Sequence, residues 1–255
     1  MKETLYTIPL NDAFHADDEC PFCFIERNLE QNSLDFILGT AYMESDIREA
    51  TDKKGFCRAH LKQMYDYGNA LGNALMLKTH YMRLNQEMKE QMERYSPQKG
   101  AFKNPFKKTA LTDTQRENAM AAWIQAKENS CYVCEYNRNT YDRYLDTFFY
   151  MYKKDPAFKD MVKESKGFCL HHFGELMETS ESKLSDKEKK EFCEILFPLM
   201  EQNMKRVEED LSWFVNKFDY RYKDQDWKNS RDAVPRGMQK LHGGYPADLP
   251  YKENK

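Results

Sequence analysis

The chain has 255 residues, of which 32% are charged and 40% are hydrophobic, and 39 Lys+Arg against 42 Asp+Glu give a net charge of −3. This length suffices for one large or two small domains, and the slightly acidic balance argues against a dedicated nucleic-acid binder. Mean hydropathy is −0.90, and no apolar run approaches the roughly 18 residues of a membrane helix. Residues 1–5 open no hydrophobic signal region. We therefore expect a cytoplasmic protein without a membrane partner.

Only 10 Gly and 9 Pro interrupt the chain, which favours an all-α fold over a turn-rich β fold. A polar loop is expected over residues 51–54, and Ser185 is expected to cap a long helix. The apolar spacing predicts, in chain order, helices over 21–38, from about 61, over 69–95, over 134–152, from 156, from 169, over 186–218 and over 232–241. The aromatic side chains of the 134–152 helix are expected in the core: Tyr136, Tyr141, Tyr144, Phe148 and Phe149.

Six of the seven cysteines follow a pattern that occurs twice. A Cys-x2-Cys pair is followed, after 33 residues in the first copy and 34 in the second, by a Cys-x2-His pair. The first copy consists of Cys20, Cys23, Cys57 and His60, and the second of Cys131, Cys134, Cys169 and His172. Without a secretory signal, such clusters are typical of metal or redox sites rather than of disulfides.

The two copies extend beyond these residues. Cys20 and Cys131 are 111 positions apart, and Cys57 and Cys169 are 112 positions apart, so one inserted residue relates the copies. The segment Lys-Gly-Phe-Cys stands at 54–57 and again at 166–169. Recurrence at a fixed shift is typical of a duplicated unit. It predicts a first metal-binding repeat over 16–96, a basic linker and short helix over 97–126, a second repeat over 127–219 and an aromatic tail over 220–255.

Zinc in structural sites prefers four tetrahedral nitrogen and sulfur ligands, and Cys3His is a common set. We therefore predict a helical bundle of two tandem pseudo-repeats, each held by one Cys3His zinc site, with two ions per chain. The spacing leaves open whether each site forms within one repeat or between the two. His171 could replace His172 as a ligand, but the repeat register favours His172. Cys193 lies outside the pattern and is expected to be a small buried hydrophobe.

In each copy, one arginine stands four residues after the second cysteine of the Cys-x2-Cys pair. On a helix, this spacing places Arg27 beside Cys23 and Arg138 beside Cys134. Three thiolates on Zn²⁺ leave a net charge of −1, which these guanidinium groups would offset from outside the ligand set. The alternative is that both arginines are simply solvated.

Residues 97–110 contain no acidic residue, and Lys99, Lys103, Lys107 and Lys108 make this segment basic. We interpret it as a solvated linker rather than a binding patch for an acidic partner. Thr112 or Asp113 would cap a short helix through Ala126. The aromatic tail has no counterpart after the first repeat and is expected to pack on the bundle.

The duplicated Cys-x2-Cys and Gly-Phe-Cys-x2-His motifs, with Arg four residues after the second Cys, resemble a group of uncharacterised bacterial proteins from anaerobic Firmicutes. The tail is similar to theirs at Asp226-Trp227, Arg236 and Leu241-His242-Gly243. The resemblance covers most of the chain and implies a family of unknown function. It brings no established activity or substrate.

We favour a non-enzymatic scaffold or adaptor that acts through protein partners, because four ligands close each zinc site. The alternative is a redox protein or an iron–sulfur protein that uses the same cysteines. A nucleic-acid binder is the third reading, and the net charge opposes it. The sequence contains no P-loop, dinucleotide-binding, zinc-protease or hydrolase motif, and it names no catalytic residue.

Overall fold

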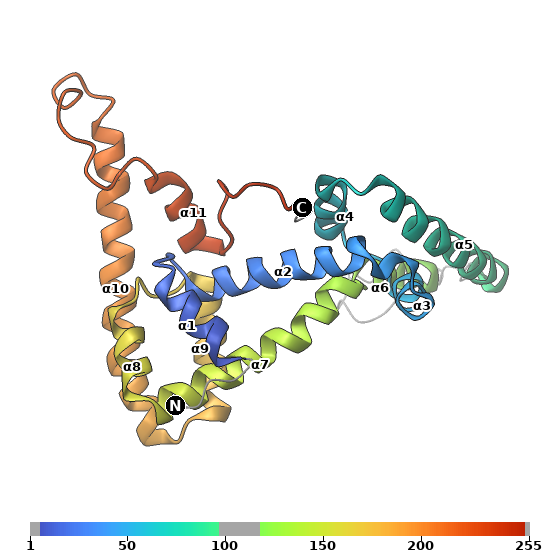
Figure 1. Cartoon of the computed structure of the whole chain (residues 1–255), viewed down its shortest axis with the longest axis horizontal. Helices are drawn as coiled ribbons and strands as arrows, with labels where there is room; N and C mark the ends of the chain where they lie inside the picture. Colours follow the sequence, from blue (N-terminus) through green and yellow to red (C-terminus); the bar gives the residue numbers. More distant parts are fainter. Residues whose placement is uncertain (1–5, 97–117, 253–255) are drawn as a thin grey trace, which may run out of the picture. The chain divides into compact units, whose positions relative to one another are not determined.

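The computed structural model describes residues 6–96 and 118–252 (Figure 1). Within these ranges the chain forms eleven α-helices and one short 3-10 helix, η1, and it has no β-strand. The predicted all-α class is therefore confirmed. None of the helices in the described ranges is both long and apolar enough to span a lipid bilayer.

Most of the predicted helices match observed ones to within a few residues. The elements are α1 (Thr7–His15), α2 (Pro21–Gly39), η1 (Ala41–Met43), α3 (Ser45–Lys54), α4 (Arg58–Tyr67), α5 (Ala70–Arg94), α6 (Ala119–Glu128), α7 (Tyr132–Lys154), α8 (Pro156–Glu164), α9 (Leu170–Lys183), α10 (Asp186–Asn216) and α11 (Ala233–His242). Ser185 caps α10 as predicted, because its hydroxyl accepts the Glu188 N–H while the Glu188 carboxylate accepts the Ser185 N–H.

One prediction about local structure was wrong, and another falls on residues that the structure does not describe. Residues 51–54 are not a loop but the last turn of α3, where Lys53 and Lys54 favour the helix C-terminus electrostatically. Helix α3 was not predicted, because its ten residues are mostly polar and show no helical spacing of apolar residues. The predicted caps at 112 and 113 and the lysines of the basic linker lie outside the described residues. Helix α6 begins at Ala119 and is capped by Asn118.

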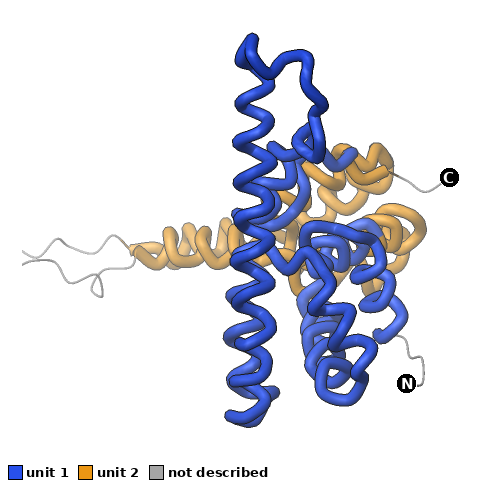
Figure 2. Tube along the Cα trace, turned by 90° about the vertical axis from the view of Figure 1, so that its left-hand side faces the viewer, with its two compact units in different colours: residues 1–31, 137–249 blue, residues 32–136, 250–255 orange. Residues whose placement is uncertain are grey.

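The chain divides into two compact units (Figure 2). Unit 1 comprises Met1–Gln31 and Asn137–Leu249, and unit 2 comprises Asn32–Tyr136 and Pro250–Lys255. Helix α2 begins in unit 1 and ends in unit 2, whereas α7 begins in unit 2 and ends in unit 1. The units therefore differ from the predicted consecutive ranges, because each predicted repeat contributes residues to both units.

The core of unit 1 is built from aromatic rings around Phe148 of α7, which is fully buried. Its ring contacts those of Phe22 (centroids 5.5 Å apart), Phe158 (5.7 Å) and Phe168 (6.3 Å), all at steep angles. Such edge-to-face packing suits the quadrupoles of the rings. The aromatic stripe of α7 is therefore core as predicted, except that Tyr136 is exposed.

The core of unit 2 is smaller and mostly aliphatic. Its buried residues are Leu34, Ile37, Leu38, Met64, Tyr67, Met76, Cys131 and Val133. Helix α5 contacts α3 at Asp52, among other places: the Thr79 hydroxyl donates to the Asp52 carboxylate (2.6 Å), and His80 Nδ1 lies 2.9 Å from the Asp52 carbonyl oxygen. Each unit thus has its own core, and each core contains cysteines of the repeated motif.

Candidate metal centres

The eight motif residues gather into two groups in which the potential ligand atoms all lie within 4.8 Å of one another. Cluster 1 consists of Cys20, Cys23, Cys169 and His172, and all its residues belong to unit 1. Cluster 2 consists of Cys57, His60, Cys131 and Cys134, and all its residues belong to unit 2. Each group could hold one metal ion.

The composition of the clusters answers a question that the spacing left open: each cluster forms between the two copies of the motif. Cluster 1 combines the Cys-x2-Cys pair of the first repeat with the Cys-x2-His pair of the second, and cluster 2 combines the remaining two pairs. The physical reason lies in α2 and α7. Each Cys-x2-Cys pair opens one of these helices, and each helix then continues out of the unit that contains its own cysteines.

The Cys-x2-His pairs adopt the same local structure in both copies. Cys57 and Cys169 are the N-caps of α4 and α9, with φ and ψ of −73° and 166° in the first case and −73° and 163° in the second. The glycines two residues earlier, Gly55 and Gly167, have φ of 66° and 73°, a conformation that other residues rarely adopt. A Cβ at Gly55 would also lie 2.7 Å from the His80 ring. The Gly-Phe-Cys segment is therefore a turn that aims the cysteine and, one helical turn later, the histidine toward one point.

In cluster 1 the histidine faces the sulfurs through Nδ1. The distances from His172 Nδ1 are 3.2 Å to Cys20 Sγ, 3.5 Å to Cys23 Sγ and 3.1 Å to Cys169 Sγ. The sulfurs of Cys23 and Cys169 are 3.8 Å apart. His171 points elsewhere, with Nε2 3.8 Å from the Glu175 carboxylate. The repeat register therefore selected the histidine that lies among the sulfurs.

Cluster 2 has the same geometry. His60 Nδ1 lies 3.2 Å from Cys57 Sγ and 3.3 Å from the sulfurs of both Cys131 and Cys134. The sulfurs of Cys57 and Cys134 are 3.8 Å apart. The Tyr132 N–H donates to the Gly55 carbonyl oxygen at 3.0 Å, which joins the two segments that carry the cysteines.

The pKa values within the clusters are strongly displaced. Burial acts to lower the pKa of His172, but contacts with Cys169, Cys20 and Glu26 outweigh it and raise the pKa to about 12. Hydrogen bonds from Cys20 and Cys23 lower the pKa of Cys169. Burial acts to raise the pKa of Cys131, but its contacts with His60 and with backbone N–H groups lower it to about 6. Without a cation the ligands share protons, and a divalent ion that replaces these protons would stabilise all three thiolates of a cluster together.

A carboxylate lies behind the histidine of cluster 1. Glu26 Oε2 is 3.3 Å from His172 Nε2, on the opposite side of the ring from the sulfurs. A carboxylate at this position orients a ligating histidine and increases its basicity. Sequence reasoning missed Glu26, although its place three residues after Cys23 puts it on the same side of α2.

The two predicted arginines pair with carboxylates. Arg27 contacts Asp248 at 2.7 Å and the Leu249 carbonyl oxygen at 3.0 Å. Arg138 contacts Asp142 at 2.9 Å on its own helix and lies 3.7 Å from Glu175. Their proposed compensation of thiolate charge stays a prediction. Cys193 belongs to neither cluster among the described residues and is partly buried on α10.

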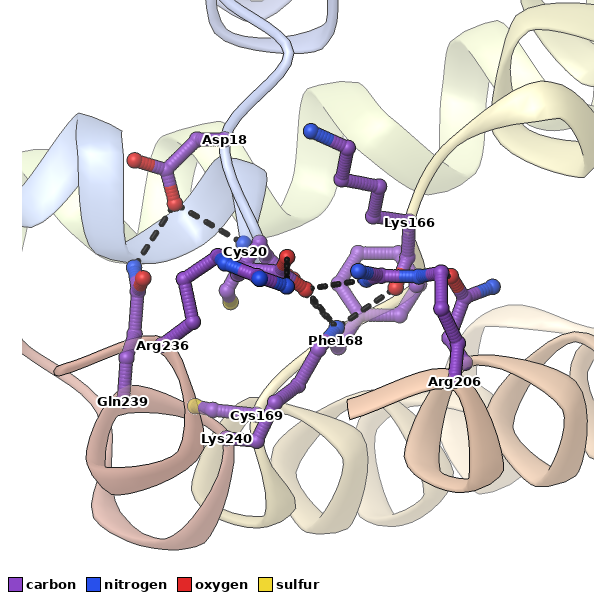
Figure 3. Close-up of polar contacts among 12 residues, drawn as sticks. Asp18, Cys20, Lys166, Phe168, Cys169, Arg206, Arg236, Gln239 and Lys240 are labelled. Carbon is purple, nitrogen blue, oxygen red and sulfur yellow. Dashed lines mark hydrogen bonds and ion pairs between the residues drawn. The ribbon is translucent and has the colours of Figure 1, made fainter. Parts of the chain in front are cut away.

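A buried amine of the tail joins the two segments that lead into cluster 1. Lys240 of α11 is 1% exposed, and its Nζ donates to the carbonyl oxygens of Glu19 (2.6 Å) and Lys166 (2.5 Å). Glu19 precedes Cys20, and Lys166 stands three residues before Cys169. Figure 3 shows Lys240 between these segments. Sequence reasoning missed this lysine, because nothing in the tail's own pattern relates it to Glu19 and Lys166, which stand 221 and 74 positions earlier.

The Glu19 carboxylate is itself buried and paired with cations. It accepts from Arg206 at 2.5 Å and lies 3.3 Å from Lys240 Nζ and 3.4 Å from Arg236. Burial acts to raise the pKa of Glu19, but the hydrogen bond from Arg206 and the charge of Lys240 lower it. Next to it, Asp18 accepts from the Cys20 N–H and from Gln239 (Figure 3). Helices α10 and α11 thus fix the approach to Cys20 through charge as well as packing.

Comparison with known proteins supplies the family. Residues 1–248 match the model described as "Family of unknown function (DUF6062)". The chain belongs to this family. It is also 20% identical over 205 residues to a protein of Caldicellulosiruptor sp. (strain Rt8B.4), described as "Uncharacterized 23.9 kDa protein in xynA 3'region". That alignment covers 80% of this chain and 85% of the relative. No solved structure matches the chain significantly. The predicted resemblance to a bacterial family of unknown function is confirmed.

Double variants test the exchange of ligand pairs between repeats. Cys20→Ser with Cys169→Ser damages cluster 1 alone, so this protein should retain one metal ion per chain. Cys20→Ser with Cys57→Ser damages both clusters and should retain none. Native mass spectrometry of the metal-loaded proteins counts the ions. The reverse order of stoichiometries would mean that each repeat binds its own ion.

The Glu19→Gln variant tests the buried charges of unit 1. Removing the carboxylate leaves Lys240 and Arg236 without their shared counter-charge, so unfolding free energy should fall by about 3–5 kcal/mol. Because the pKa of Glu19 is lower in the folded chain, its contribution should be complete above its unfolded pKa and be lost as pH falls. Urea unfolding at several pH values measures both effects. The exposed Glu201→Gln is the matched control, with an expected change within about 0.5 kcal/mol. Equal stability of the two variants at neutral pH would contradict the role of Glu19.

Proposed function

We propose that this chain is a zinc-stabilised helical scaffold or adaptor protein with two structural Cys3His sites. The observation that carries the proposal is the gathering of three cysteine sulfurs and one histidine nitrogen within 4.8 Å of one another, once in each unit. Cys3His is a standard ligand set for structural zinc. Because four protein ligands fill a tetrahedral shell, neither site would keep a position for water or substrate.

The distances within the clusters support a single small ion in each. Tetrahedral zinc with Zn–S of about 2.3 Å and Zn–N of about 2.0–2.1 Å requires S···S edges of about 3.8 Å and N···S edges of about 3.6 Å. One S···S distance in each cluster, Cys23 to Cys169 and Cys57 to Cys134, is 3.8 Å. The Nδ1···S distances range from 3.1 to 3.5 Å and are therefore shorter than the N···S edge of a zinc site, so the sulfurs and nitrogen would move slightly apart around a bound ion. A disulfide would require sulfurs at about 2.05 Å.

The iron–sulfur alternative receives less support from this geometry. A cluster with several irons is held by ligands on different metal atoms, which must therefore stand further apart than the edges of one tetrahedron. Here all ligand atoms of a cluster lie within 4.8 Å of one another. A mononuclear ion fits this spacing better, and zinc suits the mixture of three thiolates and one imidazole.

A scaffold also requires a surface for a protein partner. Helices α10 and α11 border an apolar hollow of about 330 Å³ in unit 1. Its lining includes Met204, Leu211, Val234 and Met238, and the last two side chains are substantially exposed. Apolar surface of this kind is compatible with the contact of a protein partner, and cluster 1 would hold fixed the segments on which α11 packs.

Elemental analysis of protein purified without oxygen tests the metal. We expect two zinc ions per chain and no absorption in the visible range. Cys57→Ser should lose one ion and destabilise unit 2, because a bound structural zinc contributes on the order of 10 kcal/mol in small zinc peptides. Cys193→Ser is the matched control, since this cysteine belongs to neither cluster, and it should keep both ions and its melting temperature.

Bound iron with visible absorption would replace the zinc proposal by the iron–sulfur alternative. Protein without stoichiometric metal, together with equal melting temperatures for the Cys57→Ser and Cys193→Ser variants, would contradict both metal readings.

A further inference from the structure

The two clusters differ in their access to solvent. In cluster 1 every ligand is buried, with exposed fractions of 0% for Cys20, Cys169 and His172 and 5% for Cys23. In cluster 2, Cys134 is exposed and Cys57 is half-buried. A dissolved oxidant can therefore reach two sulfurs of cluster 2 directly, whereas cluster 1 must open before any of its sulfurs can react.

The tail that follows the second repeat contributes to this difference. A Cβ placed on Gly243, at the end of α11, would lie 3.5 Å from the sulfurs of both Cys23 and Cys169. The tail backbone therefore lies directly against cluster 1, and the contacts of Lys240 hold α11 in place. Figure 3 shows Gln239 of α11 bonded to Asp18, two residues before Cys20, and Lys240 bonded to Lys166, three residues before Cys169. The sequence after the first repeat has no counterpart of this tail.

The two N-cap cysteines also differ in the hydrogen bonds that their sulfurs accept, and this difference again favours reaction at cluster 2. Cys169 Sγ accepts the backbone N–H of His172 at 3.4 Å. Among the described residues the matching cysteine, Cys57, accepts no such capping hydrogen bond. An N–H donor withdraws electron density from a thiolate and makes it a weaker nucleophile. Cys57 thus keeps more of its reactivity toward an oxidised neighbour.

We propose that Cys57 and Cys134 of cluster 2 are an oxidation site for hydroperoxides, at which disulfide formation releases the ion. This inference rests on the proposed function, because the ion released is the zinc of cluster 2. Cluster 1 keeps its ion under the same conditions.

The reaction needs only the peroxide as oxidant. The exposed Cys134 sulfur attacks the O–O bond, takes up one oxygen as a sulfenic acid, and the other oxygen leaves as an alcohol or water after protonation. The Cys57 sulfur, 3.8 Å away, then attacks the Cys134 sulfur and displaces hydroxide, which leaves as water. Two zinc-bound thiolates, one peroxide and two protons from solvent thus give one disulfide, one alcohol or water and one further water. The ion retains only Cys131 and His60 as ligands and dissociates.

The test uses the full chain loaded with two zinc ions. Hydrogen peroxide is added, free zinc is followed with a colorimetric chelator, and the remaining thiols are alkylated and mapped by mass spectrometry. We expect loss of one of the two ions and a disulfide between Cys57 and Cys134, with the thiols of cluster 1 still alkylated. Reduction with a dithiol should restore zinc binding.

Two single variants serve as a matched pair, since each retains one cluster. Cys131→Ser should keep only the ion of cluster 1 and retain it in peroxide, whereas Cys20→Ser should keep only the ion of cluster 2 and lose it. If Cys20→Ser does not fold, disulfide mapping of the unsubstituted chain still decides. Release of both ions at equal rates, retention of both, or a disulfide elsewhere would overturn the proposal. A chain that binds no zinc before peroxide is added would instead overturn the proposed function.

Discussion

The structure depends on an exchange of ligand pairs between two copies of one motif. Each Cys-x2-Cys pair opens a long helix, α2 or α7, and its sulfurs meet the Cys-x2-His pair of the other copy. Each helix then supplies core residues to the unit that it enters, such as Leu34 from α2 and Phe148 from α7. A metal ion in each cluster would therefore fix the point where a helix that belongs to both units begins. Neither repeat has a complete ligand set within one compact unit.

Much of this arrangement could be predicted from the sequence. The shift of 111 or 112 positions identifies all eight clustered residues and selects His172 over His171. The positive φ of Gly55 and Gly167 explains why the same Gly-Phe-Cys turn stands in both copies. The exchange itself could not be predicted, because the ligand types and spacings are equivalent for both pairings. The choice between the two pairings depends on the paths of α2 and α7, each of which runs from the unit that contains its cysteines into the other unit.

Residues from outside the motif make the two clusters unlike each other. The tail places Lys240 and Gly243 against cluster 1, and the buried Glu19 balances the cations that α10 and α11 bring there. None of these contacts follows from local periodicity, because they join segments that are far apart in the sequence. The recurring motif thus accounts for the common set of cysteines and histidine, whereas the tail contributes to the burial of cluster 1 and cluster 2 has an exposed cysteine.

The most direct test of the central claim is to identify which residues bind the same ion. Heteronuclear NMR of the chain loaded with ¹¹³Cd detects scalar coupling between each cadmium nucleus and the protons of its own ligands. The exchange predicts two cadmium signals, one coupled to Cys20, Cys23, Cys169 and His172 and the other to the remaining four residues. A cadmium signal coupled to both Cys20 and Cys57 would contradict it.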